Sequence, residues 1–286
     1  MRRWIAAVAM AGAAAILMSG CTSLPQGVDA AIADEWTDIK PPTGWSPEPG
    51  NCQAAAFTET IYRSNYLPIA CTDEHKTEVV HVGTFPESVR NVPSRGGPEL
   101  LAALAECDAK STAFLGGHWQ DGKLWIGVSM PSSEAWISGT RWFRCEVVQL
   151  DDLYGDAVSR KSSLKDALKT DASVKIGCQN YKSGAGFTPI ACTSKHNAEY
   201  AGSYFGAKSY AALKNKQAMW DACYKIIAKW ANVSASTVKY RTGIVTSYPS
   251  QAEWNEGDHA VRCWLWLDRK TVTKSMKGAG SKGLPM

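Results

Sequence analysis

Residues 68–78 read PIACTDEHKTE, and residues 189–199 read PIACTSKHNAE. Both stretches follow the pattern Pro-Ile-Ala-Cys-Thr-x-x-His-x-x-Glu, in which a cysteine, a histidine and a glutamate keep one spacing. Such self-similarity within one chain indicates an internal repeat, which decides how the rest of the sequence is organised. The repeated polar residues are His75 and Glu78 in the first copy and His196 and Glu199 in the second.

Further landmarks recur in the same order around this motif. A Pro-Ser-x-x-x-Trp pattern ends at Trp136 and again at Trp254, and Arg-Cys pairs end at Cys145 and Cys263. We therefore interpret the chain as a tandem duplication of a unit of about 100 residues, an ordinary size for a domain. The expected repeats cover residues 49–151 and 174–270, with a linker at 152–173 and a disordered basic tail at 271–286.

Nine cysteines occur in the chain, and eight of them fall into two sets of four. An even number in an exported chain indicates a disulfide framework. Three pairings are open within each set. We favour joining the first two cysteines, which flank a short loop, and joining the third, in a helical segment, to the fourth, in a late strand. These pairs are Cys52–Cys71, Cys107–Cys145, Cys178–Cys192 and Cys223–Cys263.

The ninth cysteine, Cys21, follows a stretch that has the features of an export signal. Two arginines precede a run of 14 apolar residues from Trp4 to Leu17, which is shorter than the roughly 20 residues that span a bilayer. The residues Ser19-Gly20-Cys21 resemble the bacterial lipobox. This resemblance implies a lipoprotein signal peptide at 1–20, a lipid on Cys21, a tether at 21–48 and an extracytoplasmic location on the cell membrane.

Hydrophobic periodicity indicates strands and one long helix in each copy. Residues 98–114 and 209–231 carry apolar side chains at helical spacing, and β-branched runs before and after them read as strands. The expected fold class is α+β, with two tandem small disulfide-stapled domains, each an antiparallel sheet with one long helix.

Charge limits the classes of partner. Residues 1–20 contain two arginines and no acid, so the chain beyond them has 29 basic and 27 acidic residues. A net charge of +2 lacks the strong basic excess that is typical of nucleic-acid-binding domains, so we expect no nucleic acid as a partner.

A glycine shortly before Cys52, the repeated motif and the Val79-Val80 strand start together resemble the septum formation domain family of actinobacterial envelope proteins. The second copy departs from the pattern at Tyr200, where the valine pair is missing. The resemblance implies an association with cell division and supplies no reaction and no catalytic residue.

The repeated histidine and glutamate allow two interpretations. They are ligand types for a metal and could form an acid–base pair in an envelope hydrolase or metal-dependent enzyme. However, each copy supplies only one histidine at the motif, and no nucleophile motif or phosphate loop is present. We therefore expect a structural role for the motif, with no catalytic residue, no metal and no cofactor.

Two tryptophans of the second copy suggest a binding surface. Trp264 and Trp266 alternate with apolar residues in one strand, and their counterparts in the first copy are Glu146 and Val148. If the apolar face points inward, both indole rings are exposed. The sequence thus predicts a membrane-anchored binding or scaffold lipoprotein, with envelope proteins, division proteins or peptidoglycan as candidate partners.

Overall fold

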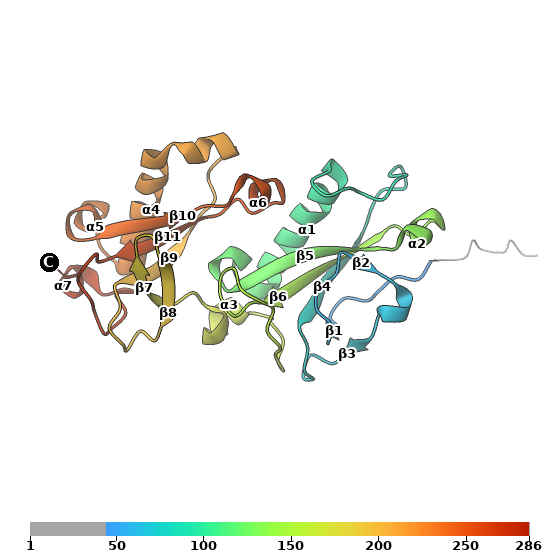
Figure 1. Ribbon diagram of the computed structural model, residues 1–286, viewed down its shortest axis with the longest axis horizontal. Coiled ribbons are helices and arrows are strands. Elements are labelled where there is room, and N and C mark those ends of the chain that lie inside the picture. The colour runs from blue at the N-terminus through green and yellow to red at the C-terminus, as the bar shows by residue number, and fades with distance from the viewer. Residues whose placement is uncertain (1–43, 286) are drawn as a thin grey trace, which may run out of the picture. The chain divides into compact units, whose positions relative to one another are not determined.

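The computed structural model describes residues 44–285, in which each copy of the repeat builds its own sheet (Figure 1). The signal peptide, Cys21 and residues 21–43 of the tether lie outside the described residues. No helix within the described part is both long enough and apolar enough to cross a membrane.

The first repeat contains a six-stranded sheet in the order β2-β5-β6-β4-β1-β3. Helix α1 packs against β4, β5 and β6 through an apolar core. The elements are β1 (Cys52–Gln53), β2 (Thr60–Ile61), β3 (Pro68–Ile69), β4 (Thr77–Thr84), α1 (Pro98–Leu115), β5 (Leu124–Pro131), α2 (Ser133–Ile137) and β6 (Trp142–Gln149), with 3-10 turns η1 (Arg63–Asn65) and η2 (Trp119–Asp121).

The second repeat contains a five-stranded sheet in the order β10-β11-β9-β7-β8, with α4 packed on β9, β10 and β11. Two short elements, α3 (Ala167–Thr170) and η3 (Ala172–Val174), lead into it. Its elements are β7 (Cys178–Lys182), β8 (Gly186–Ile190), β9 (Ala198–Tyr204), η4 (Tyr210–Lys214), α4 (Lys216–Ala231), α5 (Ala235–Arg241), β10 (Gly243–Ser247), α6 (Gln251–Asn255), β11 (Val261–Trp266) and α7 (Gly280–Gly283).

The two sheets share one topology, and the predicted α+β class is confirmed. Strands β5-β6-β4-β1-β3 correspond one for one to β10-β11-β9-β7-β8. Even an irregularity recurs, because the register shifts by one residue at Val80 in β4 and at Ala201 in β9. The first sheet differs from the expected antiparallel arrangement in one pair, since β2 runs parallel to β5.

The long helices begin and end where local chemistry places them. Helix α1 starts at Pro98, whose missing N–H needs no partner at a helix start, and ends before Gly116 in a left-handed conformation with φ of 77°. Helix α4 starts later than expected because Asn215 caps it, accepting a hydrogen bond from the N–H of Ala218. The residues before that cap form the separate 3-10 turn η4.

Four disulfides connect the elements, and they join the four pairs that the cysteine positions favour. Cys107 and Cys145 attach α1 to β6, and Cys223 and Cys263 attach α4 to β11 at the equivalent place. Each such crosslink stabilises a domain by about 2–4 kcal/mol. The bridges are consistent with an extracytoplasmic protein, because the cytoplasm keeps thiols reduced.

The expected disordered tail at 271–286 is wrong for its described part. Met276 and Leu284 are buried in the core of the second repeat, against α4, α5 and β11. The lysines and glycines of this segment suggested disorder, but its few apolar residues are spaced so that they reach that core. Similarly, the expected linker at 152–173 buries Leu164 in the core of the first repeat.

Candidate binding site between the two repeats

The repeated glutamate of the second copy holds the end of the chain in place. Glu199 is buried and accepts hydrogen bonds from His196 Nε2 at 3.0 Å, Ser275 Oγ at 2.6 Å and the Met276 N–H at 2.8 Å. The backbone of His196 also exchanges two hydrogen bonds with Val272. The motif therefore anchors the segment that closes this repeat.

The first copy uses its motif in the same way. Glu78 accepts from Ser163 Oγ at 2.6 Å and from the Leu164 N–H at 2.7 Å, and the backbone of His75 pairs with Arg160. The imidazole Nδ1 of His75 lies 2.7 Å from the Asp73 carbonyl oxygen. In contrast to the second copy, no hydrogen bond joins His75 Nε2 to Glu78 within the described residues.

These contacts make the motif a closing device in each repeat. The cysteine and glutamate side chains do gather within 4.8 Å of one another, a grouping that could suggest a metal site. However, both cysteines of each group are joined in a disulfide and offer no thiolate. The carboxylates of Glu78 and Glu199 already accept hydrogen bonds from the segments that close each repeat.

The predicted exposed pair Trp264 and Trp266 is wrong for Trp264, which is fully buried, while Trp266 is partly buried. Aromatic residues of the β7–β8 hairpin, which β9 separates from β11 in the sheet, cover this face. Phe187 stacks on Trp264 with ring centroids 4.4 Å apart, and Tyr181 meets Trp266 edge-on at 5.6 Å. An alternating pattern within β11 alone does not reveal that these rings cover it.

Polar contacts join the two repeats. Arg262 Nε donates to the Gln120 carbonyl oxygen at 3.1 Å, and both side chains are buried. The Tyr200 hydroxyl of β9 bonds to Asp121 Oδ1 in η2, and it lies 2.7 Å from Ser203 Oγ. Loss of water around this hydroxyl and the nearby Asp121 charge together raise the pKa of Tyr200 well above its ordinary value. Residues from Gly44 onward form one compact unit.

Removing the Tyr200 hydroxyl should weaken this junction and change its pH dependence. We expect Tyr200→Phe to lower the free energy of unfolding by about 2 kcal/mol, because Asp121 loses a hydrogen-bond donor. The raised pKa of Tyr200 adds stability that is fully present below about pH 10 and decreases as the pH rises toward the folded-state pKa. The variant should therefore show a shallower loss of stability above pH 10 in urea titrations.

Tyr240 supplies the matched control, since its side chain is 90% exposed. Tyr240→Phe should match the wild type at every pH. Equal alkaline profiles for Tyr200→Phe and the wild type would contradict the assigned role of the hydroxyl.

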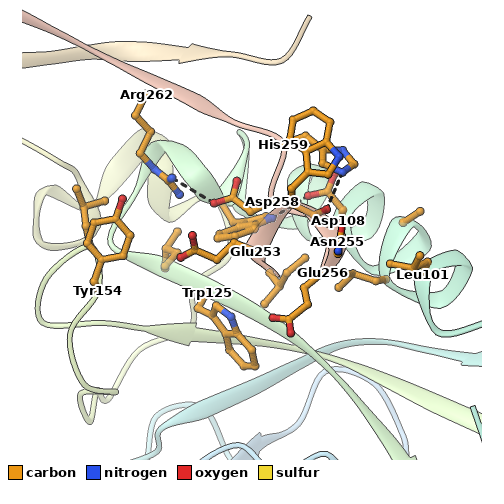
Figure 2. Close-up of a pocket in the computed structure, with 18 of the residues that line it drawn as sticks. Leu101, Asp108, Trp125, Tyr154, Glu253, Asn255, Glu256, Asp258, His259 and Arg262 are labelled. Atoms are coloured by element: carbon orange, nitrogen blue, oxygen red, sulfur yellow. Dashed lines mark hydrogen bonds and ion pairs between the residues drawn. The ribbon is translucent and has the colours of Figure 1, made fainter. Parts of the chain in front are cut away.

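A cavity of about 490 Å³ lies where residues of both repeats meet (Figure 2). The first repeat supplies one face of α1, the start of β5 and the loop after β6, which carries Tyr154. The second repeat supplies α6 and the loop that follows it. Leu101, Trp125 and Tyr154 bring exposed apolar surface to this cavity, with 37%, 36% and 68% of each residue accessible. Apolar walls with a few polar groups are typical of ligand sites.

Carboxylates dominate the charged groups of the cavity. Asp258 pairs with Arg262 at 3.2 Å, and Glu256 pairs with Arg95 at 3.1 Å. The second pair is exposed and connects α6 to the loop before α1. Both arginines are therefore already matched by acids.

Two further carboxylates have no cationic partner among the described residues. Asp108 accepts a hydrogen bond from Trp119 Nε1 at 2.8 Å, and Glu253 accepts one from the Ser250 N–H at 2.7 Å as part of the cap of α6. These are neutral donors. The cavity thus carries a surplus of negative charge beside apolar surface.

The sequence did not single out these residues. Trp254 is the counterpart of the buried Trp136, yet it is only partly buried and lines the cavity, and the ring of His259 is tilted against it at a centroid distance of 4.2 Å. The cavity residues come from different parts of both copies. A signal was nevertheless present, because Glu256 and Asp258 follow the Pro-Ser-x-x-x-Trp landmark in the second copy, whereas Ser138 and Thr140 stand at these positions in the first.

The chain is a disulfide-stabilised α+β protein made of two repeats, with a cavity that both repeats line. The sequence profile described as septum formation matches residues 49–263, which is most of the chain, and the chain belongs to this family. The family resemblance of the repeated motif is thereby confirmed. No curated protein and no solved structure matches the chain significantly. The family description connects the chain with cell division or the cell envelope and names no reaction.

Proposed function

We propose that the chain is a binding lipoprotein without catalytic activity that acts in septum formation or envelope assembly. A lipid on Cys21 would hold it on the outer face of the cell membrane, and the lipobox-like residues before Cys21 support this anchor. The family membership supports the process. The near-neutral charge beyond residue 20 supports a partner other than nucleic acid.

The observation that carries the binding role is the acid-lined cavity between the repeats. It offers exposed aromatic and aliphatic surface together with carboxylates that have no cationic partner among the described residues. In contrast, the glutamates of the repeated motif are buried and hold the closing segments. A hydrolase that used the motif would need those carboxylates free to meet substrate.

The anchor is tested by Cys21→Ser. We expect the variant to leave the membrane fraction while the folded domain keeps its four disulfides, because it lacks the thiol to which the proposed lipid is attached. The measurement is the distribution between membrane and soluble fractions. Continued attachment of Cys21→Ser to the membrane would refute the anchor.

The role of the cavity is tested by Leu101→Arg in cells that lack the native gene. Leu101 is an exposed helix position, so the variant should fold normally. The long cationic side chain of the introduced arginine should then fill the acid-lined cavity. Leu67→Arg is the matched control, because Leu67 is 71% exposed and lies outside that cavity. The readout is the spacing of septa after fluorescent labelling of new cell wall, with equal protein levels verified.

We expect cells with Leu101→Arg to show the septal defect of the deletion and cells with Leu67→Arg to resemble the wild type. Normal septa with Leu101→Arg, beside a clear defect in the deletion, would exclude the cavity as the site. A deletion without septal or envelope defect would refute the proposed process.

A further inference from the structure

Strand β5 has one edge that is open for most of its length. On one side β6 pairs with it from Leu124 to Ser129, whereas on the other side β2 reaches only Met130 and Pro131. Within residues 44–285 no strand pairs with the second edge between Leu124 and Val128. Unpaired edges of this kind accept further strands.

The register shows which backbone groups lie at the open edge. The Met130 N–H donates to the Glu59 carbonyl oxygen and therefore points toward the β2 side. Backbone groups of a strand alternate between its two edges, so the N–H and C=O groups of Ile126 and Val128 point to the same side. No described residue hydrogen-bonds to these groups there. The edge thus presents donors and acceptors in strand spacing.

Two adjoining cavities follow this open edge. The cavity of Figure 2 reaches from Leu124 to Ile126, and a second one of about 100 Å³ continues from Trp125 to Met130. Residues 124–128 of β5 thus line one cavity or the other, and among these five Trp125 alone is exposed. An added strand of about five residues would cover them, since a strand rises 3.3–3.4 Å per residue.

The walls above this edge are acidic. In Figure 2 the carboxylates of Glu253 and Glu256 lie on the side of the cavity that faces Trp125. Glu59 and Glu256 share the single guanidinium of Arg95, and Asp108 lines the same space without a cationic partner in the described part of the chain. A segment that enters this groove gains from carrying basic side chains.

We propose that the ligand of this cavity is an extended, basic peptide segment of a partner protein that adds a strand to the open edge of β5. The inference rests on the proposed function, because it specifies what the cavity between the repeats binds. Main-chain hydrogen bonds to Ile126 and Val128 supply affinity for any extended segment, and the carboxylates select lysine or arginine side chains.

Two other occupants fit the charges less well. The chain's own residues 21–43 contain four acids and one lysine, so they would be repelled by the acidic walls. A second copy that paired through its own β5 would bring two acidic walls together. The peptide-binding experiment also distinguishes each of these occupants from a partner peptide.

The test uses the chain from residue 21 onward with Cys21→Ser and a synthetic heptapeptide that alternates lysine and valine. Fluorescence anisotropy measures the dissociation constant of this peptide. Two control peptides are measured in the same way: one with glutamate in place of lysine, and one with alternate backbone nitrogens methylated. The lysine–valine peptide is also measured at high salt. Hydrogen exchange reports whether the bound peptide protects the backbone amides of Ile126 and Val128.

We expect the lysine–valine peptide to bind and to slow exchange at both amides. Backbone methylation should weaken binding about tenfold or more, because the main-chain donors are lost, and the glutamate peptide should not bind. Salt should weaken binding through screening. Equal affinity of the methylated peptide, or unchanged exchange at Ile126 and Val128, would overturn strand addition.

Protein variants test the acidic walls. Glu253→Gln combined with Glu256→Gln should weaken binding of the lysine peptide about tenfold, whereas Glu87→Gln, an exposed acid away from the cavity, should leave it unchanged. Equal weakening by Glu87→Gln would show that only the net charge of the protein matters, and it would overturn the role assigned to Glu253 and Glu256. Tighter peptide binding after removal of residues 21–43, or a dimer that the peptide dissociates, would assign the edge to this chain itself.

These outcomes are separable from those of the cell experiment. If the peptide fails to bind while Leu101→Arg still disturbs septation, strand addition is wrong and the cavity remains the functional site. If septation is normal with Leu101→Arg, the proposed function fails whatever the peptide does.

Discussion

Replacing Glu199 by alanine is expected to lower the free energy of unfolding by about 3–5 kcal/mol, a range typical of breaking a buried charged network. The carboxylate is buried and accepts three hydrogen bonds, two of which come from Ser275 and Met276 in the closing segment. Without it, the Met276 N–H and His196 Nε2 lose their acceptor inside the protein. The measurement is the urea midpoint, together with proteolysis of the segment after Val272.

The controls separate this network from a simple loss of charge. Glu74→Ala changes an exposed acid of the same motif in the first copy and should alter stability by less than about 0.5 kcal/mol. Glu199→Gln keeps the volume but weakens the acceptor, so its effect should be intermediate. Glu78→Ala should also destabilise, because Ser163 and Leu164 lose their acceptor. A urea midpoint of Glu199→Ala equal to that of Glu74→Ala would disprove the closing role.

Features that depend on spacing along the chain could be predicted from the sequence. The duplication follows from the repeated motif alone, and the helix at Pro98 follows from apolar period and a favourable first residue. The disulfide pairs follow from placing Cys107 in that helix and Cys145 in a late strand. Each of these inferences depends either on residues that are close in sequence or on a pattern that occurs in both copies.

Features that depend on contacts between distant segments could not be predicted. Composition assigned residues 271–286 to a disordered tail, because nothing local shows that Ser275 and Met276 return to Glu199. The open edge of β5 likewise depends on where β2 ends its pairing. The cavity is lined by α1 of one repeat and α6 of the other, and no sequence pattern within either copy predicts that these helices lie close together.

The two copies conserve their closing motif and differ in the surfaces around it. Both place a buried glutamate beneath a returning segment, whereas only the second copy has the acidic residues that follow α6 and line the cavity. The equivalent strand positions Glu146 and Trp264 are both buried, the first in an ion pair with Arg144 and the second in an aromatic cluster. Duplication thus kept the fold and changed what each face contacts.

Replacing Trp264 by alanine is expected to cost about 3–5 kcal/mol, the usual range for deleting a large buried aromatic side chain. The indole is fully buried, with Phe187 stacked on one side and Tyr200 edge-on at a centroid distance of 5.4 Å. Its removal leaves a hole beneath the β7–β8 hairpin and loosens Tyr200 at the junction of the repeats. Urea unfolding followed by far-UV circular dichroism measures the loss.

Two variants make the result specific to burial. Trp220→Ala removes a tryptophan that is 42% exposed in the same repeat, so it should cost about 1 kcal/mol or less. Trp264→Phe should cost less than Trp264→Ala, because it keeps an aromatic ring and removes an indole Nε1 that has no hydrogen-bond partner among the described residues. If Trp264→Ala were as stable as Trp220→Ala, Trp264 would be an exposed side chain and the aromatic cluster would be wrong. Loss of stability with the expected ranking would instead make Trp264 part of the core that positions Tyr200 against the first repeat.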